Sequence, residues 1–330
     1  MPTVTSDVNG DEGMQLPPSG EQYGIARGGS QAFITQVGAT LRSYTVGGQD
    51  VLDGFGVGER ATDGRGQVLA PWPNRLTDGR YQYGGRACQA PLNEVSRHDA
   101  IHGLVRWLDW TPVERDPATI TLACALRPQP GYEWHLDLRV TYALEDRGLT
   151  VTFEAVNLDR EPAPFGVGFH PYLTLGTPSI DGLELTIPAS RVLAPNHSRR
   201  GPTPTATAGT LGDFRQPRTI GSVELDAAFG DLAVGPDGHA VARLSDPDSE
   251  RSVELWVDSA YRYLMVYTGD QVGEPRRRRT AVAIEPMTCP PDAFRTGVDL
   301  IELEPRSPWQ GSWGLRSVEA AKRQPTGRSS

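Results

Sequence analysis

Apolar and polar residues alternate along several short stretches of this chain. In the clearest stretch the apolar residues occupy every second position: Trp134, Leu136, Leu138, Val140 and Tyr142. A period of two residues is typical of a strand with one buried face, because successive side chains of a strand point to opposite sides. The same alternation occurs at residues 120–126, 149–155 and 253–257. These stretches predict β-strands.

Glycine and proline punctuate the chain between the predicted strands. The sequence contains 37 Gly and 28 Pro, and most of them fall where turns are needed. The one helix that the pattern suggests is short, near residues 317–323. Many strands without intervening helices predict an all-β protein, a large antiparallel β-sandwich. We expect one domain at residues 20–315, with flexible tails at 1–19 and 316–330.

Charge and cysteine content narrow the classes of function. The formal net charge of -9 argues against nucleic acid or an anionic membrane as a partner, since both bind clusters of Lys and Arg. The three cysteines are too few and too far apart for a disulfide framework or a zinc knuckle, which predicts free thiols in a reducing compartment. No export signal and no long apolar segment is visible, so we expect a cytoplasmic protein.

Polar residues that could bind a ligand occur in two N-terminal segments. Asn74 and Arg75 follow two prolines in LAPWPNRLTDGRYQYGG, where the stiffened chain could hold the guanidinium ready to donate to hydroxyl oxygens. His102 precedes Gly103 in AIHGLVRW, and that glycine permits close approach of a ligand or of backbone. A surface arginine beside a turn and a buried, hydrogen-bonded histidine are the structural alternatives.

Three further candidates lie in the C-terminal half. His170 precedes Pro171 in PFGVGFHPYLTL, which favours an extended backbone at the histidine. Asp226 in VELDAAF is interpreted as a carboxylate at the end of a strand, a position that turn-forming residues also occupy. Glu285 ends the apolar strand of AVAIEPMTCPPDAF, on the face opposite Val282 and Ile284. Poor solvation there should raise its carboxyl pKa toward the value that a general base needs, unless the glutamate serves a structural ion pair.

Taken in order, these five segments resemble the aldose 1-epimerase family, the galactose mutarotases, from about residue 25 to residue 305. The family sequence has an Asn-Arg pair, an Ile-His-Gly, a His-Pro-Tyr, an Asp followed three residues later by an aromatic residue, and a Glu-Pro near its C-terminus. Leu104 departs from the second glycine that is common in galactose-acting members. The segments PWPNRLTDGRY and EPMTCPPDAF look closer to the bacterial branch related to sulfosugar mutarotases.

The resemblance implies a supersandwich of the galactose-mutarotase-like type that binds a monosaccharide in an open cleft. It places Glu285 at the general base, His170 at the general acid, and His102, Arg75 and Asp226 where the family binds sugar oxygens; Asn74 adjoins them. The implied reaction opens the ring by removing a proton from the C1 hydroxyl and giving one to the ring oxygen. It needs no cofactor and no metal.

Four alternatives remain open from the sequence. Asp226 and Glu285 could form the carboxylate pair of a glycoside hydrolase. The chain could bind a sugar without catalysis, or hold a metal with His102, His170 and Glu285. The four arginines at residues 276–279 could instead bind a phosphorylated or sulfonated hexose, although an exposed charged loop is the favoured interpretation of that run.

Overall fold

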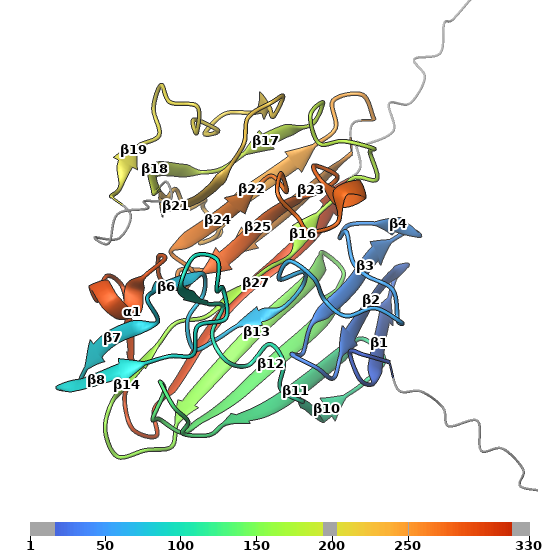
Figure 1. The fold of residues 1–330 in the computed structure, drawn as a ribbon. Helices are drawn as coiled ribbons and strands as arrows, with labels where there is room; N and C mark the ends of the chain where they lie inside the picture. The colour runs from blue at the N-terminus through green and yellow to red at the C-terminus, as the bar shows by residue number, and fades with distance from the viewer. Residues whose placement is uncertain (1–16, 194–202, 250, 319–330) are drawn as a thin grey trace, which may run out of the picture.

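The computed structural model describes residues 17–193, 203–249 and 251–318. Within these ranges the regular secondary structure consists almost entirely of β-strands (Figure 1). The strands form two large antiparallel sheets, a four-stranded sheet and three strand pairs. The prediction of an all-β antiparallel architecture is confirmed. Neither helical element of the described chain has the length or the apolar character that crossing a bilayer requires.

The first large sheet holds nine strands of the described chain. In spatial order they are β10 (Thr111–Arg115), β11 (Thr119–Leu126), β12 (Leu136–Glu145), β13 (Gly148–Asn157), β27 (Pro308–Val318), β23 (Ser252–Val257), β22 (Ala240–Ser245), β17 (Glu184–Thr186) and β20 (Arg218–Thr219). Four of them, β11, β12, β13 and β23, are the stretches that the alternating pattern predicts. Their apolar positions are buried, as in β12, where Leu136, Leu138 and Val140 are fully enclosed.

The second large sheet carries the candidate site. Its described strands are β19 (Thr205–Ala206), β18 (Ala189–Leu193), β21 (Asp226–Leu232), β24 (Tyr263–Tyr267), β25 (Val282–Met287), β15 (Gly168–Phe169) and β5 (Val68–Leu69), while β16 (Tyr172–Leu173) also pairs with β25. Strand β25 is central and all six of its residues are buried. Such a strand is expected to read as a continuous apolar run, which makes the one charged residue in it, Glu285, conspicuous.

One apolar core joins the two large sheets. Phe169 of the second sheet lies 5.1 Å, ring centroid to ring centroid, from Trp313 and 6.1 Å from Phe153, both of the first sheet. Val282 and Ile284 of β25 enter this core, whereas Ala281 and Ala283 pack with Tyr172 in a separate cluster on the other face. The predicted alternation along β25 is thus confirmed, and it directs Glu285 away from the core.

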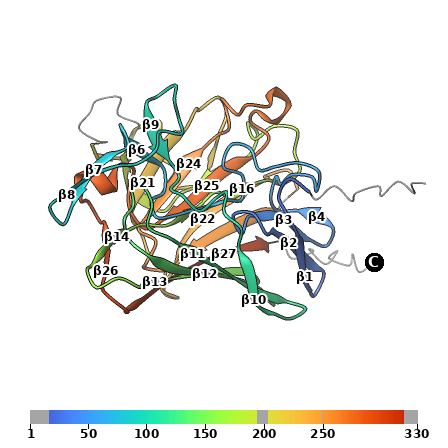
Figure 2. The same cartoon turned by 60° about the horizontal axis from the view of Figure 1, so that its bottom comes forward.

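The remaining strands lie at the margins. Strands β1 (Gln22–Arg27), β2 (Ser30–Thr35), β3 (Leu41–Val46) and β4 (Gln49–Asp50) form the blue sheet at one end of the molecule in both views (Figures 1 and 2). The other pairs are β6 (Arg75–Thr77) with β9 (Asp99–Ile101), β7 (Arg80–Tyr83) with β8 (Arg86–Gln89), and β14 (Ala163–Phe165) with β26 (Ile301–Leu303).

The helix prediction near residues 317–323 is wrong for the part of this segment that the structure describes. Ser317 and Val318 are the last residues of β27, and the rest of that segment lies outside the described residues. The described helical elements are instead the 3-10 turn η1 (Pro275–Arg277) and the single turn α1 (Ala293–Thr296), which stops at Gly297 in a left-handed conformation. Strand pairing with β23 outweighs the local helix preference of the C-terminal segment.

Candidate active site

An open cleft of about 650 Å³ lies over the second large sheet. Its lining includes every candidate that the sequence analysis selected: Asn74, Arg75, His102, His170, Asp226 and Glu285. These residues come from segments up to about two hundred positions apart, and the strand order of the sheet brings them together. Met265 and Tyr267 of β24 supply apolar surface beside them.

Glu285 lies on the floor of the cleft and is 2% exposed. One carboxyl oxygen, Oε1, is 3.4 Å from Nε2 of His170, while Oε2 is buried without a hydrogen-bond partner. Burial raises the pKa of this carboxyl well above its ordinary value, and the nearby carboxylate of Asp226 raises it further, against a smaller opposing effect of Arg75. An unsatisfied buried oxygen is costly, so it marks a place where a ligand hydroxyl can bind.

His170 follows β15 and is held through its backbone, which accepts a hydrogen bond from Gly66 N and donates one to Gln67 O. The imidazole stacks on Tyr172 at 5.0 Å between centroids, with 14° between the rings. Burial lowers the pKa of His170 to about 3, and the guanidinium of Arg65, which lies over the Tyr172 ring, adds to the effect. The neutral imidazole is therefore the favoured form.

His102 faces His170 edge to face, with the ring centroids 5.4 Å apart. Its backbone has a positive φ of 63°, and the next residue, Gly103, has φ 64°. A Cβ on Gly103 would lie 2.1 Å from the carbonyl oxygen of Ala70, so the close approach predicted for this glycine is one of backbone to backbone. Burial and the neighbouring His170 lower the pKa of His102, which leaves a neutral imidazole.

Arg75 does not stand free beside a turn, as the sequence allowed. Its Nε and one terminal nitrogen donate to both carboxylate oxygens of Glu94, at 2.7 and 3.0 Å. Burial lowers the pKa of Arg75, but the hydrogen bonds and charge of Glu94, with the charges of Asp226 and Asp99, together outweigh this and leave the pKa raised. Asn74 orients the same segment: it is buried with φ 53°, and its side-chain Oδ1 accepts a hydrogen bond from the backbone of Arg75.

Asp226 begins β21, which corrects the expectation that it ends a strand. It pairs across the sheet with Tyr267, and both side chains line the cleft. Starting the strand leaves the carboxylate at the cleft margin, where it remains partly exposed, rather than in a turn. From there its charge acts on Glu285.

Sequence reasoning missed two residues that shape this site. Glu94, which holds Arg75, occupies an irregular segment without a pattern that distinguishes it from a surface glutamate. Gly64 has φ 75°, and a Cβ there would lie 2.4 Å from Cδ2 of His170, so only glycine admits the imidazole in this position. Nothing in the local sequence points to that contact, because the two residues are more than a hundred positions apart.

The arginine run at residues 276–279 lies outside the cleft lining. Arg277 pairs with Asp53 and Glu274, and Arg279 pairs with Asp181 and Asp270, so both are only partly exposed. Arg276 and Arg278 are the exposed members, and 74% of the Arg276 side chain is accessible. The interpretation as an exposed charged loop therefore holds for Arg276 and Arg278 and not for Arg277 and Arg279.

The thiols and the possible metal ligands can be described for the same ranges. Cys88, Cys124 and Cys289 are each buried and unpaired, as expected for free thiols. Among the described residues no group of three or more His, Cys, Asp or Glu side chains has an arrangement suited to a metal ion.

Comparison with known proteins agrees with this geometry. The family model for aldose 1-epimerase matches residues 21–316. The Escherichia coli protein YihR is 35% identical over 292 residues, which cover 88% of this chain and 91% of YihR. A maltose epimerase from Levilactobacillus brevis is 26% identical over 295 residues, or 79% of this chain and 84% of that protein.

The fold is similar to that of solved structures. The crystal structure of a GalM/aldose epimerase homologue from Caenorhabditis elegans aligns with a TM-score of 0.80 at 18% identity, over 91% of this chain and 99% of that chain. This likeness shows a fold of the galactose-mutarotase-like kind. With the family match over nearly the whole described length, it establishes that the chain belongs to the aldose 1-epimerase family, a family of isomerases.

Proposed function

We propose that this protein interconverts the α and β anomers of a free aldohexose, with Glu285 and His170 as the acid–base pair. The observation that carries the proposal is the contact between them: Glu285 Oε1 and His170 Nε2 lie 3.4 Å apart on the floor of an open cleft, and each side chain retains an unpartnered buried polar atom. Ring opening needs one group that accepts a proton and one that donates a proton at the same time.

The ionisation of the pair fits this chemistry. Burial favours neutral His170 and a protonated Glu285, so a single proton resides on the pair. When a cyclic sugar binds, the proton passes to His170, and Glu285 then accepts the proton of the C1 hydroxyl while His170 protonates the ring oxygen. The pair is then again a neutral imidazole and a carboxylic acid. The form that burial favours is therefore the one that accompanies the open-chain aldehyde, and closure on the other face reverses the transfers.

Arg75, His102, Asp226 and Asn74 bind the sugar in this proposal. Arg75 has five N–H donors and Glu94 engages two of them, which leaves donors for hydroxyl oxygens. The bidentate ion pair fixes the plane of the guanidinium, which lowers the entropy cost of ordering it on binding. Asp226 adds an acceptor at the margin of the cleft.

The decisive experiment is exchange NMR or polarimetry on freshly dissolved glucose and galactose. We expect both approach to equilibrium and exchange at equilibrium to accelerate in proportion to enzyme concentration. Glycosides of the same sugars, which have no free C1 hydroxyl, should remain unchanged. Release of reducing sugar from them would favour a hydrolase, and binding of glucose without faster exchange would favour a binding protein.

The value of kcat/KM should not fall at the pH where an ordinary histidine becomes protonated. The one-proton form of the pair is lost at low pH only when His170 takes up a proton, and its pKa is about 3. Activity should therefore be nearly constant from about pH 7 down to about pH 5, since His170 is protonated only below its lowered pKa. Polarimetry corrected for buffer catalysis measures this, and a decline centred near the ordinary histidine pKa would contradict it.

Arg75→Ala should act mainly on binding. Loss of charged hydrogen bonds should raise KM for the sugar by about ten- to a hundredfold, with a smaller change in kcat. Glu94→Gln is the matched control, since it retains the guanidinium but weakens its anchoring and should give an intermediate KM. An unchanged KM in Arg75→Ala would exclude the binding role.

A second candidate substrate, a hexose that carries an anionic group, is supported by Arg106. This residue lines the cleft, forms no ion pair within the described part of the chain, and has a buried Nε without a hydrogen-bond partner. It is a better anion ligand than the arginine run, which lies outside the cleft lining and of which Arg276, Arg277 and Arg279 pair with carboxylates. Comparing glucose 6-phosphate and sulfoquinovose with glucose by exchange NMR tests this candidate and the proposed placement in the sulfosugar-related branch.

A further inference from the structure

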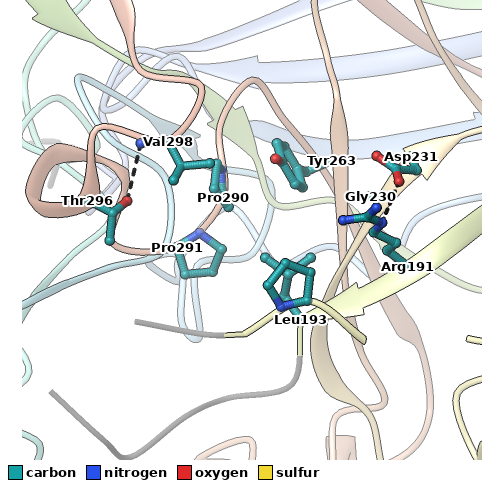
Figure 3. Close-up of a pocket in the computed structure, with 10 residues that line it drawn as sticks. Arg191, Leu193, Gly230, Asp231, Tyr263, Pro290, Pro291, Thr296 and Val298 are labelled. Carbon is teal, nitrogen blue, oxygen red and sulfur yellow. Dashed lines mark hydrogen bonds and ion pairs between the residues drawn. The ribbon is translucent and has the colours of Figure 1, made fainter. Parts of the chain in front are cut away.

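A second, smaller groove lies farther along the same face of the sheet (Figure 3). In that view Pro290, Pro291 and Val298 lie on one side of it, and Arg191 and Asp231 lie on the other. Tyr263 and Leu193 also line the groove. None of these residues belongs to the cleft that contains Glu285.

The strand register places the groove directly beside the catalytic pair. Tyr263, Met265 and Tyr267 alternate along β24, so their side chains share one face; the last two line the cleft and the first lines the groove. Across the sheet Met265 pairs with Glu285, and Tyr263 pairs with Met287. Two residues of a strand span about 7 Å. The groove therefore begins about one sugar ring away from Glu285.

An apolar cluster forms the floor between the two sites. Met265 of the cleft packs in it with Leu193 of the groove, together with Ala228 and Met287, and Tyr263 packs against its edge. The cleft and the groove thus adjoin on this face over a shared cluster that contains no charged side chain.

The groove offers a rigid apolar platform with a polar margin. A Cβ on Gly230 would lie 2.9 Å from the ring of Tyr263, so glycine lets the ring lie close over β21. The phenol donates a 2.6 Å hydrogen bond to Asp299, which fixes its orientation. At the margin Arg191 and Asp231 form an ion pair at 2.7 Å, and each side chain is 58% exposed. Aromatic rings bind apolar C–H surface, and exposed polar groups bind hydroxyls.

We propose that this groove is a subsite for the second ring of a reducing disaccharide. The inference rests on the proposed function: anomer exchange requires a free C1 hydroxyl at Glu285 and His170, so any extension of the substrate must leave from another hydroxyl of the reducing sugar. A pyranose has an apolar C–H face and a polar edge, which match the Tyr263 platform and the Arg191–Asp231 margin. The adjoining cleft makes a linked sugar the fitting occupant.

The test compares anomer exchange of glucose with that of maltose, cellobiose and isomaltose by exchange NMR. Val298 is 50% exposed at the groove, so Val298→Arg should obstruct it without disturbing the core. We expect KM for the preferred disaccharide to rise by about three- to tenfold, the range that loss of a stacking contact gives, with glucose kinetics unchanged. Val234→Arg, at a valine that is 59% exposed outside both sites, is the matched control.

Tyr263 provides an independent variant. Tyr263→Phe retains the platform and should keep disaccharide kinetics close to the wild type, whereas Tyr263→Ala should weaken disaccharides and not glucose. If neither Val298→Arg nor Tyr263→Ala changes KM for any of the disaccharides, the subsite is excluded. If the wild type does not accelerate glucose exchange, the proposed function fails instead; saturation-transfer NMR with the disaccharides then shows whether their second ring contacts the protein, and its absence overturns the subsite.

Discussion

Glu285→Gln and His170→Asn should each lower kcat for anomer exchange by about a hundred- to ten-thousand-fold, the range that positioned acid–base catalysis contributes. Glutamine has the size of glutamate but cannot accept the C1 proton, and asparagine cannot protonate the ring oxygen. The two residues contact each other at 3.4 Å, and in the proposed mechanism they act on the same substrate. Polarimetry on freshly dissolved glucose, or exchange NMR at equilibrium, measures the loss of activity.

The double variant provides the stricter test. Residues that act as one unit show strongly non-additive losses, so Glu285→Gln with His170→Asn should be little slower than the worse single variant. Circular dichroism and thermal unfolding serve as the fold control. We expect Glu285→Gln to remain folded, since it replaces a buried ionisable group, whose Oε2 has no hydrogen-bond partner, with a neutral side chain of the same size. Full activity in either folded single variant would refute the assignment.

Gly64→Ala should lower kcat/KM by about a hundredfold. The new Cβ would lie 2.4 Å from the imidazole of His170, and the positive φ of 75° adds backbone strain. Relief of that overlap requires the imidazole to shift from its position beside Glu285, and displacements of about 1 Å are enough to cause such a loss.

Gly85→Ala is the control that separates backbone strain at a positive φ from displacement of the His170 imidazole. Gly85 has φ 76°, nearly the same as Gly64, but nothing lies within 4 Å of a Cβ at that position. Both variants should carry similar backbone strain, and only Gly64→Ala should lose activity. Equal activity in the two folded variants would show that contact with Gly64 does not position His170.

Periodicity predicted the strands well because a half-buried strand leaves its signature in neighbouring residues. Strands β11, β12, β13 and β23 were found in this way, and so was the direction of Glu285, since side-chain alternation is a local property of the chain. The C-terminal end of β27 was missed because its pairing with β23 is a distant interaction that local preference does not record.

The candidate residues were also found from sequence, but what surrounds each of them was not. The order of short motifs identified His170 and Glu285, and the alternation along the strand of Glu285 predicted its raised pKa. The general-acid role implied for His170 needs a protonated imidazole, however, and burial favours the neutral form. The bidentate partner of Arg75 was likewise missed. A pKa depends on all nearby charges and on the solvent that is excluded, and neither is visible in a linear pattern.

The sequence by itself determined that the chain folds as antiparallel sheets and which side chains are the candidates for the chemistry, because strand periodicity and short motifs can be read from neighbouring residues. Only the tertiary structure decided that these side chains share one cleft, that Glu94 holds Arg75, and that Gly64 makes room for His170. Those contacts join residues from 19 to more than a hundred positions apart, and their existence depends on strand order and register in the second sheet. Neither property is encoded in the residues flanking each position.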